Sequence, residues 1–174
     1  MNLMDTLQIR KFRLEDINQV LKIYNFHIKN GFGNFQEKIL SYEEFFDLCQ
    51  NILKEDLPFL VSESDKKIIG FTYLYKFRNK SGYRFSFENS IYIDNKFIGM
   101  GIGNKLLNEL IKNSKQKSKI KTIIAVISGH NSIPSIKIHE KNGFIMIGIL
   151  KKIGFKNNKW LDSIYMQKII HEKD

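Results

Sequence analysis

The sequence predicts one α/β or α+β domain in which helices cover both faces of a single sheet. Segments with strand and helix periodicity follow one another in the order β α α β β β α β α β β. No Pro/Gly/Ser-rich linker, internal repeat or low-complexity block divides the 174 residues. A glycine-rich turn at 99–103 joins one strand to the next helix. We therefore expect residues 1–174 to form a single domain.

The composition is that of a globular protein. Hydrophobic residues make up 43% of the chain and aromatic residues 13%, which is too apolar and too aromatic for a disordered chain. The lone Cys49 excludes an intramolecular disulfide and any multi-cysteine metal site, and no metal is expected. No run of about 18 apolar residues indicates a membrane span, and residues 1–8 lack the pattern of a signal peptide. We expect a cytoplasmic protein with no membrane partner.

The chain is strongly basic, with 28 Lys and Arg against 18 Asp and Glu and a net charge of +10. A basic chain can bind nucleic acid, an anionic membrane or an anionic small ligand. Only four of the cations are arginines, the residue type that dedicated nucleic-acid surfaces favour. Scattered lysines together with abundant Asn and Ile fit an A+T-rich coding bias and a solvated surface better than they fit a nucleic-acid-binding surface. No nucleic-acid partner is expected, although nonspecific binding through charge stays open.

The first half of the chain begins with an alternating strand at 7–12 and a helix at 14–29 with apolar residues at helical spacing. A loop rich in Gly and Phe follows at 30–40. Ser41 and Glu44 form a capping-box pattern that opens a second helix.

The second half is richer in strands. Three are expected at 59–61, 68–75 and 85–93. A helix follows the glycine-rich turn, and the continuous apolar run at 122–127 is typical of a strand buried on both faces. The remaining elements are a helix at 132–142 ended by Gly143 and strands at 144–153 and 160–168, joined by a turn at Asn157–Asn158.

The glycine-rich turn is the segment that indicates chemistry. Gly99, Gly101 and Gly103 stand at alternate positions between a strand and a helix. Backbone N–H groups there approach a ligand without Cβ obstruction, and the helix N-terminus favours an anion such as a pyrophosphate. Asn104 stands where a dinucleotide-binding fingerprint needs its third glycine, and the Gly-Lys-Ser/Thr of a P-loop is absent. A turn without a ligand remains the alternative.

Several motifs resemble the GNAT superfamily of N-acetyltransferases. The segment Ile98-Gly99-Met100-Gly101-Ile102-Gly103 is similar to the family's Gln/Arg-x-x-Gly-x-Gly/Ala signature, with Ile98 in place of the usual Gln or Arg. The segment 139–144, His-Glu-Lys-Asn-Gly-Phe, resembles the phosphinothricin acetyltransferase-like branch, which has His-Glu-x-x-Gly-Phe/Tyr. Further similarities to this branch lie at 23–25, 77–88, 154–156 and 160–162, so the resemblance covers about residues 7–169.

The resemblance implies a mixed, mostly antiparallel seven-stranded sheet flanked by about four helices. It also implies an enzyme that uses acetyl-CoA as cosubstrate and acetylates the amino group of a small amino acid or analogue. Phosphinothricin, methionine sulfone and methionine sulfoximine are acceptors of this type. Direct transfer in a ternary complex and a homodimer are expected. The alternatives are a protein or peptide N-acetyltransferase and a non-catalytic CoA-binding module.

The same resemblance assigns residues to the cofactor. Strand residues 91–93 would pair with the pantetheine arm, the turn at 99–104 would hold the pyrophosphate, and Asn131 would bond the pantetheine amides or cap the next helix. The implied cofactor-binding residues are Ile91, Tyr92, Ile93, Gly99, Met100, Gly101, Ile102, Gly103, Asn104 and Asn131.

Two residues are candidates for catalysis. Glu88 would accept the proton of the acceptor's ammonium group, unless it is only a structural carboxylate. His139 would protonate the leaving thiolate or position the substrate, unless it is a histidine that packs on the sheet. Nothing marks Cys49 as an activated nucleophile, which favours direct attack.

The acceptor side is expected to be cationic and aromatic. Basic side chains before Glu88 suit a carboxylate or phosphinate on the acceptor. The implied substrate-binding residues are Phe35, Arg78, Lys80 and Tyr83. Phe35 is alternatively one of the many core phenylalanines, and Trp160 is assigned to the core or to a dimer interface rather than to the substrate.

Overall fold

The computed structural model describes residues 6–171, so most of the segment considered for a signal peptide lies outside the described residues. Its strands form one seven-stranded sheet in the order β1-β2-β3-β4-β5-β7-β6. Every neighbouring pair is antiparallel except β4 and β5, which are parallel. The strands are β1 (Gln8–Lys11), β2 (Phe59–Ser64), β3 (Lys67–Lys76), β4 (Ser86–Ile93), β5 (Thr122–Ser128), β6 (Ile145–Lys156) and β7 (Lys159–Ile169). The predicted mixed, mostly antiparallel sheet is confirmed.

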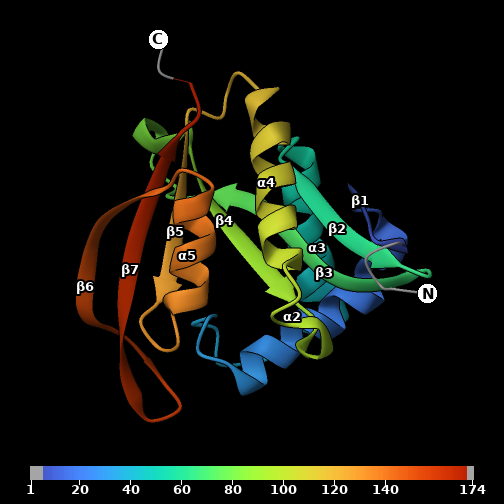
Figure 1. Ribbon diagram of the computed structural model, residues 1–174, viewed down its shortest axis with the longest axis horizontal. Coiled ribbons are helices and arrows are strands. Elements are labelled where there is room, and N and C mark those ends of the chain that lie inside the picture. Colours follow the sequence, from blue (N-terminus) through green and yellow to red (C-terminus); the bar gives the residue numbers. More distant parts are fainter. Residues whose placement is uncertain (1–5, 172–174) are drawn as a thin grey trace.

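Within the described residues 6–171, the four α-helices α2 to α5 cover the two faces of the sheet, as predicted. They are α2 (Ile17–Asn30), α3 (Tyr42–Lys54), α4 (Ile102–Lys115) and α5 (Ile133–Lys141), with 3-10 turns η1 (Leu14–Asp16), η2 (Ser81–Tyr83) and η3 (Asn95–Phe97). Side chains of a strand alternate between faces. Tyr92 of β4 contacts Tyr24 of α2, whereas its strand neighbour Asn89 bonds His139 of α5. The pair α2 and α3 therefore lies on one face and the pair α4 and α5 on the other (Figure 1).

The helix boundaries follow local signals. The predicted helix at 14–29 begins with the 3-10 turn η1, and its α-helical part runs from Ile17 to Asn30 with its apolar face buried. At the start of α3, the Glu44 amide donates to Ser41 Oγ and the Ser41 amide donates to the Glu44 carboxylate. The capping box predicted from the sequence is confirmed. Gly143 ends α5 with φ of +79°, which glycine adopts without strain.

The parallel pair β4–β5 is short, and this opens the sheet. Only Ser86, Phe87 and Glu88 pair with β5, opposite 122–124, whereas β3 stays paired with β4 as far as Ile93. Beyond Glu88 and Ile124 the two strands are no longer paired, and their ribbons diverge (Figure 1). The unpaired stretch between residues 89–93 of β4 and 125–128 of β5 is here called the notch. The prediction that 122–127 is buried on both faces is wrong for one face. Ile124 and Val126 are only half-buried, because they lie on the face of α2 and α3, and these helices pack mainly on β3 and β4.

A partly buried ion-pair cluster joins η1 to the β1–β2 end of the sheet. The Arg10 guanidinium donates to both carboxylate oxygens of Asp16, at 2.7 and 2.8 Å, and to Glu63 at 2.6 Å. Asp16 also accepts from the Arg13 amide at 2.8 Å and is 3% exposed. Burial tends to raise the pKa of Asp16, but the hydrogen bonds from Arg10 and Arg13 together hold that pKa below its ordinary value of 3.8.

We expect Asp16→Ala to lower the free energy of unfolding by about 3 kcal/mol at pH 7, because it leaves a partly buried guanidinium short of a partner. The contribution of Asp16 is fully present above its unfolded-state pKa near 3.8 and is lost as the pH falls through the lower folded-state pKa. Urea unfolding of both proteins at pH 7 and pH 3 measures this. An equal difference between the two proteins at both pH values would contradict the assignment.

Candidate active site

The edge of β4 that faces the notch has unpaired backbone groups. The Asp94 amide donates to Ile69 O at 2.9 Å, and Ser86 O accepts from Phe77, so even-numbered residues of β4 direct their backbone groups toward β3. Backbone groups alternate along a strand. Ile91 and Ile93 therefore direct theirs into the notch. By the same alternation the backbone groups of Tyr92 point toward Phe71 of β3, so within the expected segment 91–93 the groups of Ile91 and Ile93 are the ones that face the notch.

The open end of this edge already has one partner from α2. His27 Nε2 donates to Ile93 O at 2.7 Å, and the His27 ring packs against the ring of Tyr92. This contact was not expected from the sequence. The free groups of the edge are therefore concentrated around Ile91.

The glycine-rich turn forms an open cradle at the start of α4. Gly99 and Gly101 have φ of +85° and +78°, and a Cβ built at either would meet no atom within 4 Å. Lys105 is the first residue whose amide bonds within the helix, to Gly101 O. The amides of 102–104 thus lack intrahelical acceptors, and the N-cap Gly101 has no side chain to cap them. These donors and the helix dipole fit a pyrophosphate.

The other residues expected at the cofactor lie around this cradle. Met100 is 43% exposed, and Ile98, at the position where the family has Gln or Arg, is 62% exposed. The Asn104 side-chain oxygen accepts from the Asn142 side chain at 2.9 Å. Asn131 is exposed with φ of +51°, and α5 has Ser132 at its N-cap position, so Asn131 is not the helix cap.

Glu88 lies at the closed end of the notch, at the last residue of β4 that pairs with β5. Burial raises the pKa of the Glu88 carboxyl to about 7, and the positive charge of Arg78 opposes that rise. A carboxyl with this pKa is half-ionised at neutral pH. It can accept a proton and release it again under physiological conditions.

His139 is enclosed rather than presented to the notch. It is 4% exposed, its Nδ1 donates to Ser135 O at 2.7 Å, and its Nε2 accepts from the Asn89 side chain at 3.0 Å. Burial lowers the pKa of the ring, which is therefore neutral with both nitrogens in use. This geometry favours the packing alternative over a proton donor.

The residues expected on the acceptor side do not all meet. Arg78 interacts electrostatically with Glu88 and packs over the ring of Phe77. Lys80 is exposed, and Tyr83 is 45% exposed with its ring edge against Phe77. Phe35 lies elsewhere, on the α2–α3 loop, with its ring against Gly154 of β6.

Other chemistries find little support in the residues. Cys49 is fully buried, and burial raises the pKa of its thiol to about 12, so no thiolate is available. Within residues 6–171, no group of three or more His, Cys, Asp or Glu side chains is arranged to hold a metal ion. In the same range, no helix has the length and apolar character needed to cross a bilayer.

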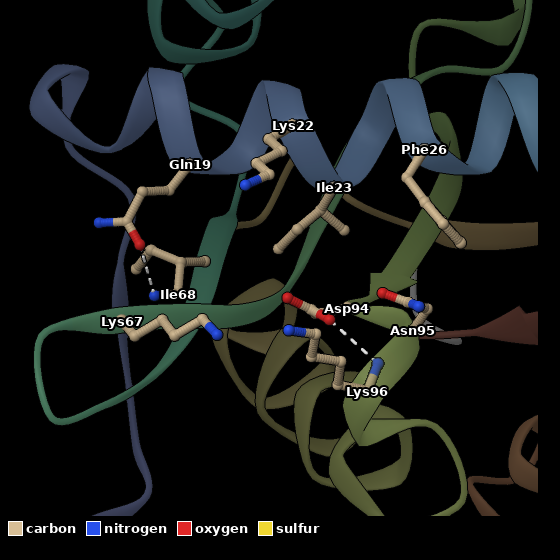
Figure 2. Close-up of a pocket in the computed structure, with 9 residues that line it drawn as sticks. All are labelled: Gln19, Lys22, Ile23, Phe26, Lys67, Ile68, Asp94, Asn95 and Lys96. Carbon is tan, nitrogen blue, oxygen red and sulfur yellow. Dashed lines mark hydrogen bonds between the residues drawn. The ribbon is translucent and has the colours of Figure 1, made fainter.

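A surface pocket of about 240 Å³ lies outside the notch, between α2 and the ends of β3 and β4 (Figure 2). It is lined by Gln19, Lys22, Ile23, Phe26, Lys67, Ile68, Asp94, Asn95 and Lys96. Glu88 and the glycine-rich turn do not contribute to it, so the pocket is separate from the site described above.

Comparison with known families agrees with this geometry. Residues 9–165 match the family described as an acetyltransferase (GNAT) domain. The chain belongs to the GNAT acetyltransferase family. The predicted family, fold and enzyme class, an N-acetyltransferase, are therefore confirmed.

Relatives of this GNAT protein include enzymes that act on amino-acid analogues. The phosphinothricin N-acetyltransferase of Alcaligenes faecalis is 33% identical over 166 residues, or 95% of this chain and 84% of the relative. The L-methionine sulfoximine/L-methionine sulfone acetyltransferase of Salmonella typhimurium is 32% identical over 66% of each chain. The crystal structure of a phosphinothricin acetyltransferase from Sinorhizobium meliloti in complex with AcCoA superimposes with a TM-score of 0.89, at 32% identity over 96% of this chain and 90% of that one.

Several residues of this site were not foreseen from the sequence. Asn34, Asn89 and Lys156 each make a buried or half-buried contact next to the notch. Lys156 had a sequence signal, since it belongs to the motif at 154–156. The Asn34 and Asn89 contacts join residues distant in the chain, which no local pattern indicates.

Gly154 has no side chain, so the Phe35 ring packs directly on the backbone of β6. We therefore expect a methyl group added at Gly154 to destabilise the fold. A Cβ at Gly154 would lie 2.3 Å from Phe35 Cε1, whereas a Cβ at Gly148 of the same strand would meet no atom within 4 Å. We expect Gly154→Ala to lower the free energy of unfolding by about 1–3 kcal/mol and Gly148→Ala to change it by less than about 0.5 kcal/mol. Thermal unfolding of the two variants checks this, and equal effects would contradict it.

Proposed function

We propose that this GNAT enzyme transfers the acetyl group of acetyl-CoA to the amino group of a small amino acid or analogue of the phosphinothricin, methionine sulfone or methionine sulfoximine type. The observation that carries the proposal is a carboxylate, Glu88, with a pKa of about 7 at the closed end of the notch. The names of the relatives support the class of acceptor.

The notch fits acetyl-CoA by two independent features. The cradle at 99–104 presents free amides to a pyrophosphate, and the free backbone groups around Ile91 can pair with a pantetheine arm. Asn131, exposed where α5 begins, is proposed to contact the same arm. When bound, acetyl-CoA supplies an activated thioester. The Ile91 amide is proposed to donate a hydrogen bond to its carbonyl oxygen. Because acetyl-CoA is an intracellular metabolite, its use supports the expected cytoplasmic location.

Glu88 is proposed to act as the general base. An acceptor amine is an ammonium ion at neutral pH and cannot attack until it loses a proton. The Glu88 carboxylate is the acceptor for this proton, directly or through one water molecule. Attack then occurs directly in a ternary complex, because the buried thiol of Cys49 is not ionised.

The acceptor's acidic group is proposed to meet the cations of the β3–β4 connection. Arg78 is placed best, since its charge already influences Glu88. Lys80 and Tyr83 are exposed on the same connection and are proposed to complete the contact. Phe35 lies apart from these three residues, with its ring on β6, and is proposed to line the acceptor side of the notch from the α2–α3 loop.

A homodimer through the β6 edge of the sheet is also proposed. Edge strands of soluble proteins are usually protected by charge or cover. This edge instead exposes large apolar side chains by between 44% and 64%. They are Ile145, Met146, Ile147, Ile149, Leu150, Ile153 and Phe155 of β6, with Trp160 of β7. A second copy of the same apolar edge would cover them.

We expect Glu88→Gln to reduce kcat/KM for the acceptor by about 10²- to 10⁴-fold, because the amide cannot accept the proton. In the native enzyme the rate should fall as the pH drops below about 7, where Glu88 becomes protonated, and this acid limb should be absent from the residual activity of the variant. Release of free thiol from acetyl-CoA with a panel of amino acids, amines and acidic peptides measures both effects.

The same assay separates the alternatives. Turnover only with peptides would overturn the proposed acceptor class and favour a peptide N-acetyltransferase. Calorimetric binding of acetyl-CoA without turnover of any amine would favour a non-catalytic module. Calorimetry with Glu88→Gln is the control, since the loss of the base should leave acetyl-CoA affinity within about twofold of the native value.

For the dimer, we expect Ile147→Lys to shift the protein to a monomer, because a charge would be buried at the β6 edge. Leu14→Lys is the matched control, since Leu14 is 45% exposed in η1 beside β1, at the opposite edge of the sheet. Sedimentation velocity measures both variants. A monomeric native protein at micromolar concentration would refute the proposed dimer.

A further inference from the structure

Lys156, the last residue of β6, buries its charge. Its side chain is 1% exposed, and its ammonium donates to the backbone oxygen of Asn34 at 2.6 Å. Among residues 6–171 it forms no ion pair. Burial lowers the pKa of Lys156, and the charge of Glu37 opposes this. Burying an ammonium group costs more free energy than burying an apolar side chain of the same size. A lysine at this position therefore suggests that its hydrogen bond to Asn34 has a role beyond stability.

Asn34 connects Lys156 to strand β4. Its side-chain amide donates to Tyr92 Oη at 3.1 Å, and its side-chain oxygen accepts from the Gln36 amide at 2.8 Å. Tyr92 shares one face of β4 with Glu88, because both are even-numbered strand residues. The negative charge of Glu88 contributes to the raised pKa of Tyr92, after burial and Tyr24, so the two side chains interact.

The loop that contains Asn34 also contacts β6 and the segment that follows β5. The Phe35 ring packs on Gly154. The centre of the Phe32 ring lies 4.4 Å from that of His130, which follows β5, and the Lys159 ammonium lies over the Phe32 ring, 5.6 Å from its centre. Residues 31–36, here called the acceptor loop, therefore bridge the gap between the diverging ends of β4 and β5. In Figure 1 the loop is the light-blue segment that follows α2.

We propose that Lys156 is a positioning residue for the acceptor. Its ammonium holds the acceptor loop against β4, so that Asn34 fixes the Tyr92 hydroxyl on the Glu88 face and Phe35 lines the acceptor side of the notch. The inference rests on the proposed function, which assigns this side of the notch to the acceptor. Lys156 itself is enclosed and does not contact the substrate.

Lys156→Met tests this, because Met keeps the length of the side chain and removes the charge-assisted hydrogen bond. We expect the KM for the acceptor to rise about tenfold, or about 1.4 kcal/mol, while kcat and the dissociation constant of acetyl-CoA stay within about twofold. Lys115→Met is the control for net charge, since Lys115 is exposed in α4. Hydrogen exchange of the amides at 31–36 should become about tenfold faster in Lys156→Met only.

Asn34→Ala is the second variant, because it keeps the buried lysine and its backbone acceptor and removes the side-chain hydrogen bonds to Tyr92 and to the Gln36 amide. A raised KM for the acceptor is expected here too, with unchanged acetyl-CoA binding. Unchanged exchange at 31–36 in Lys156→Met would overturn the inference, whatever the acceptor proves to be. An equal loss of acceptor and acetyl-CoA binding would also overturn it, since that indicates a general structural role. If the native enzyme acetylates no amine, the proposed function fails, but the exchange experiment still decides whether Lys156 holds the loop.

Discussion

The parallel pairing of β4 with β5 stops after Glu88, and the rest of the site depends on where it stops. If the pairing stopped one residue earlier, Glu88 would lie outside the paired part of β4. If it continued one residue further, a backbone group of β4 that is now free would be paired with β5. The stop turns a strand in the middle of the sheet into a local edge, with hydrogen-bonding groups that must find other partners. His27 satisfies one of them, and the groups around Ile91 are left for a ligand.

Burial of ionisable groups is the second common theme around the notch. It raises the pKa of Glu88 and lowers the pKa values of His139 and Lys156, in each case toward the uncharged form. The consequences differ because the neighbours differ. His139 has both nitrogens in hydrogen bonds and is held neutral, whereas for Glu88 the charge of Arg78 opposes protonation. The same physical effect therefore gives one packing residue and one group suited to proton transfer.

Most of the fold could be predicted from the sequence because its signals are local. The capping box at Ser41, the glycine at the end of α5 and the periodicity of α2 each determine one element without reference to the rest of the chain. The glycine cradle was predictable for the same reason. The acceptor side was not, since the contact of Lys156 with Asn34 joins residues 122 positions apart. The prediction that 122–127 is buried on both faces was wrong because the composition of a strand does not show which parts of the sheet the helices cover.

The order of strands in the sheet also divides the chain in two. All strands that precede the glycine-rich turn, β1 to β4, lie on one side of the short parallel seam, and all that follow it lie on the other. Three residue pairs form that seam, whereas the antiparallel ladders within each half are longer. Few backbone hydrogen bonds therefore join the two groups of strands, and helix α4, which follows the turn, connects them by packing on β2, β3 and β4. A ligand bound across the notch would add contacts to both groups of strands at the place where the sheet joins them least, and would stabilise the fold as well as occupy a site.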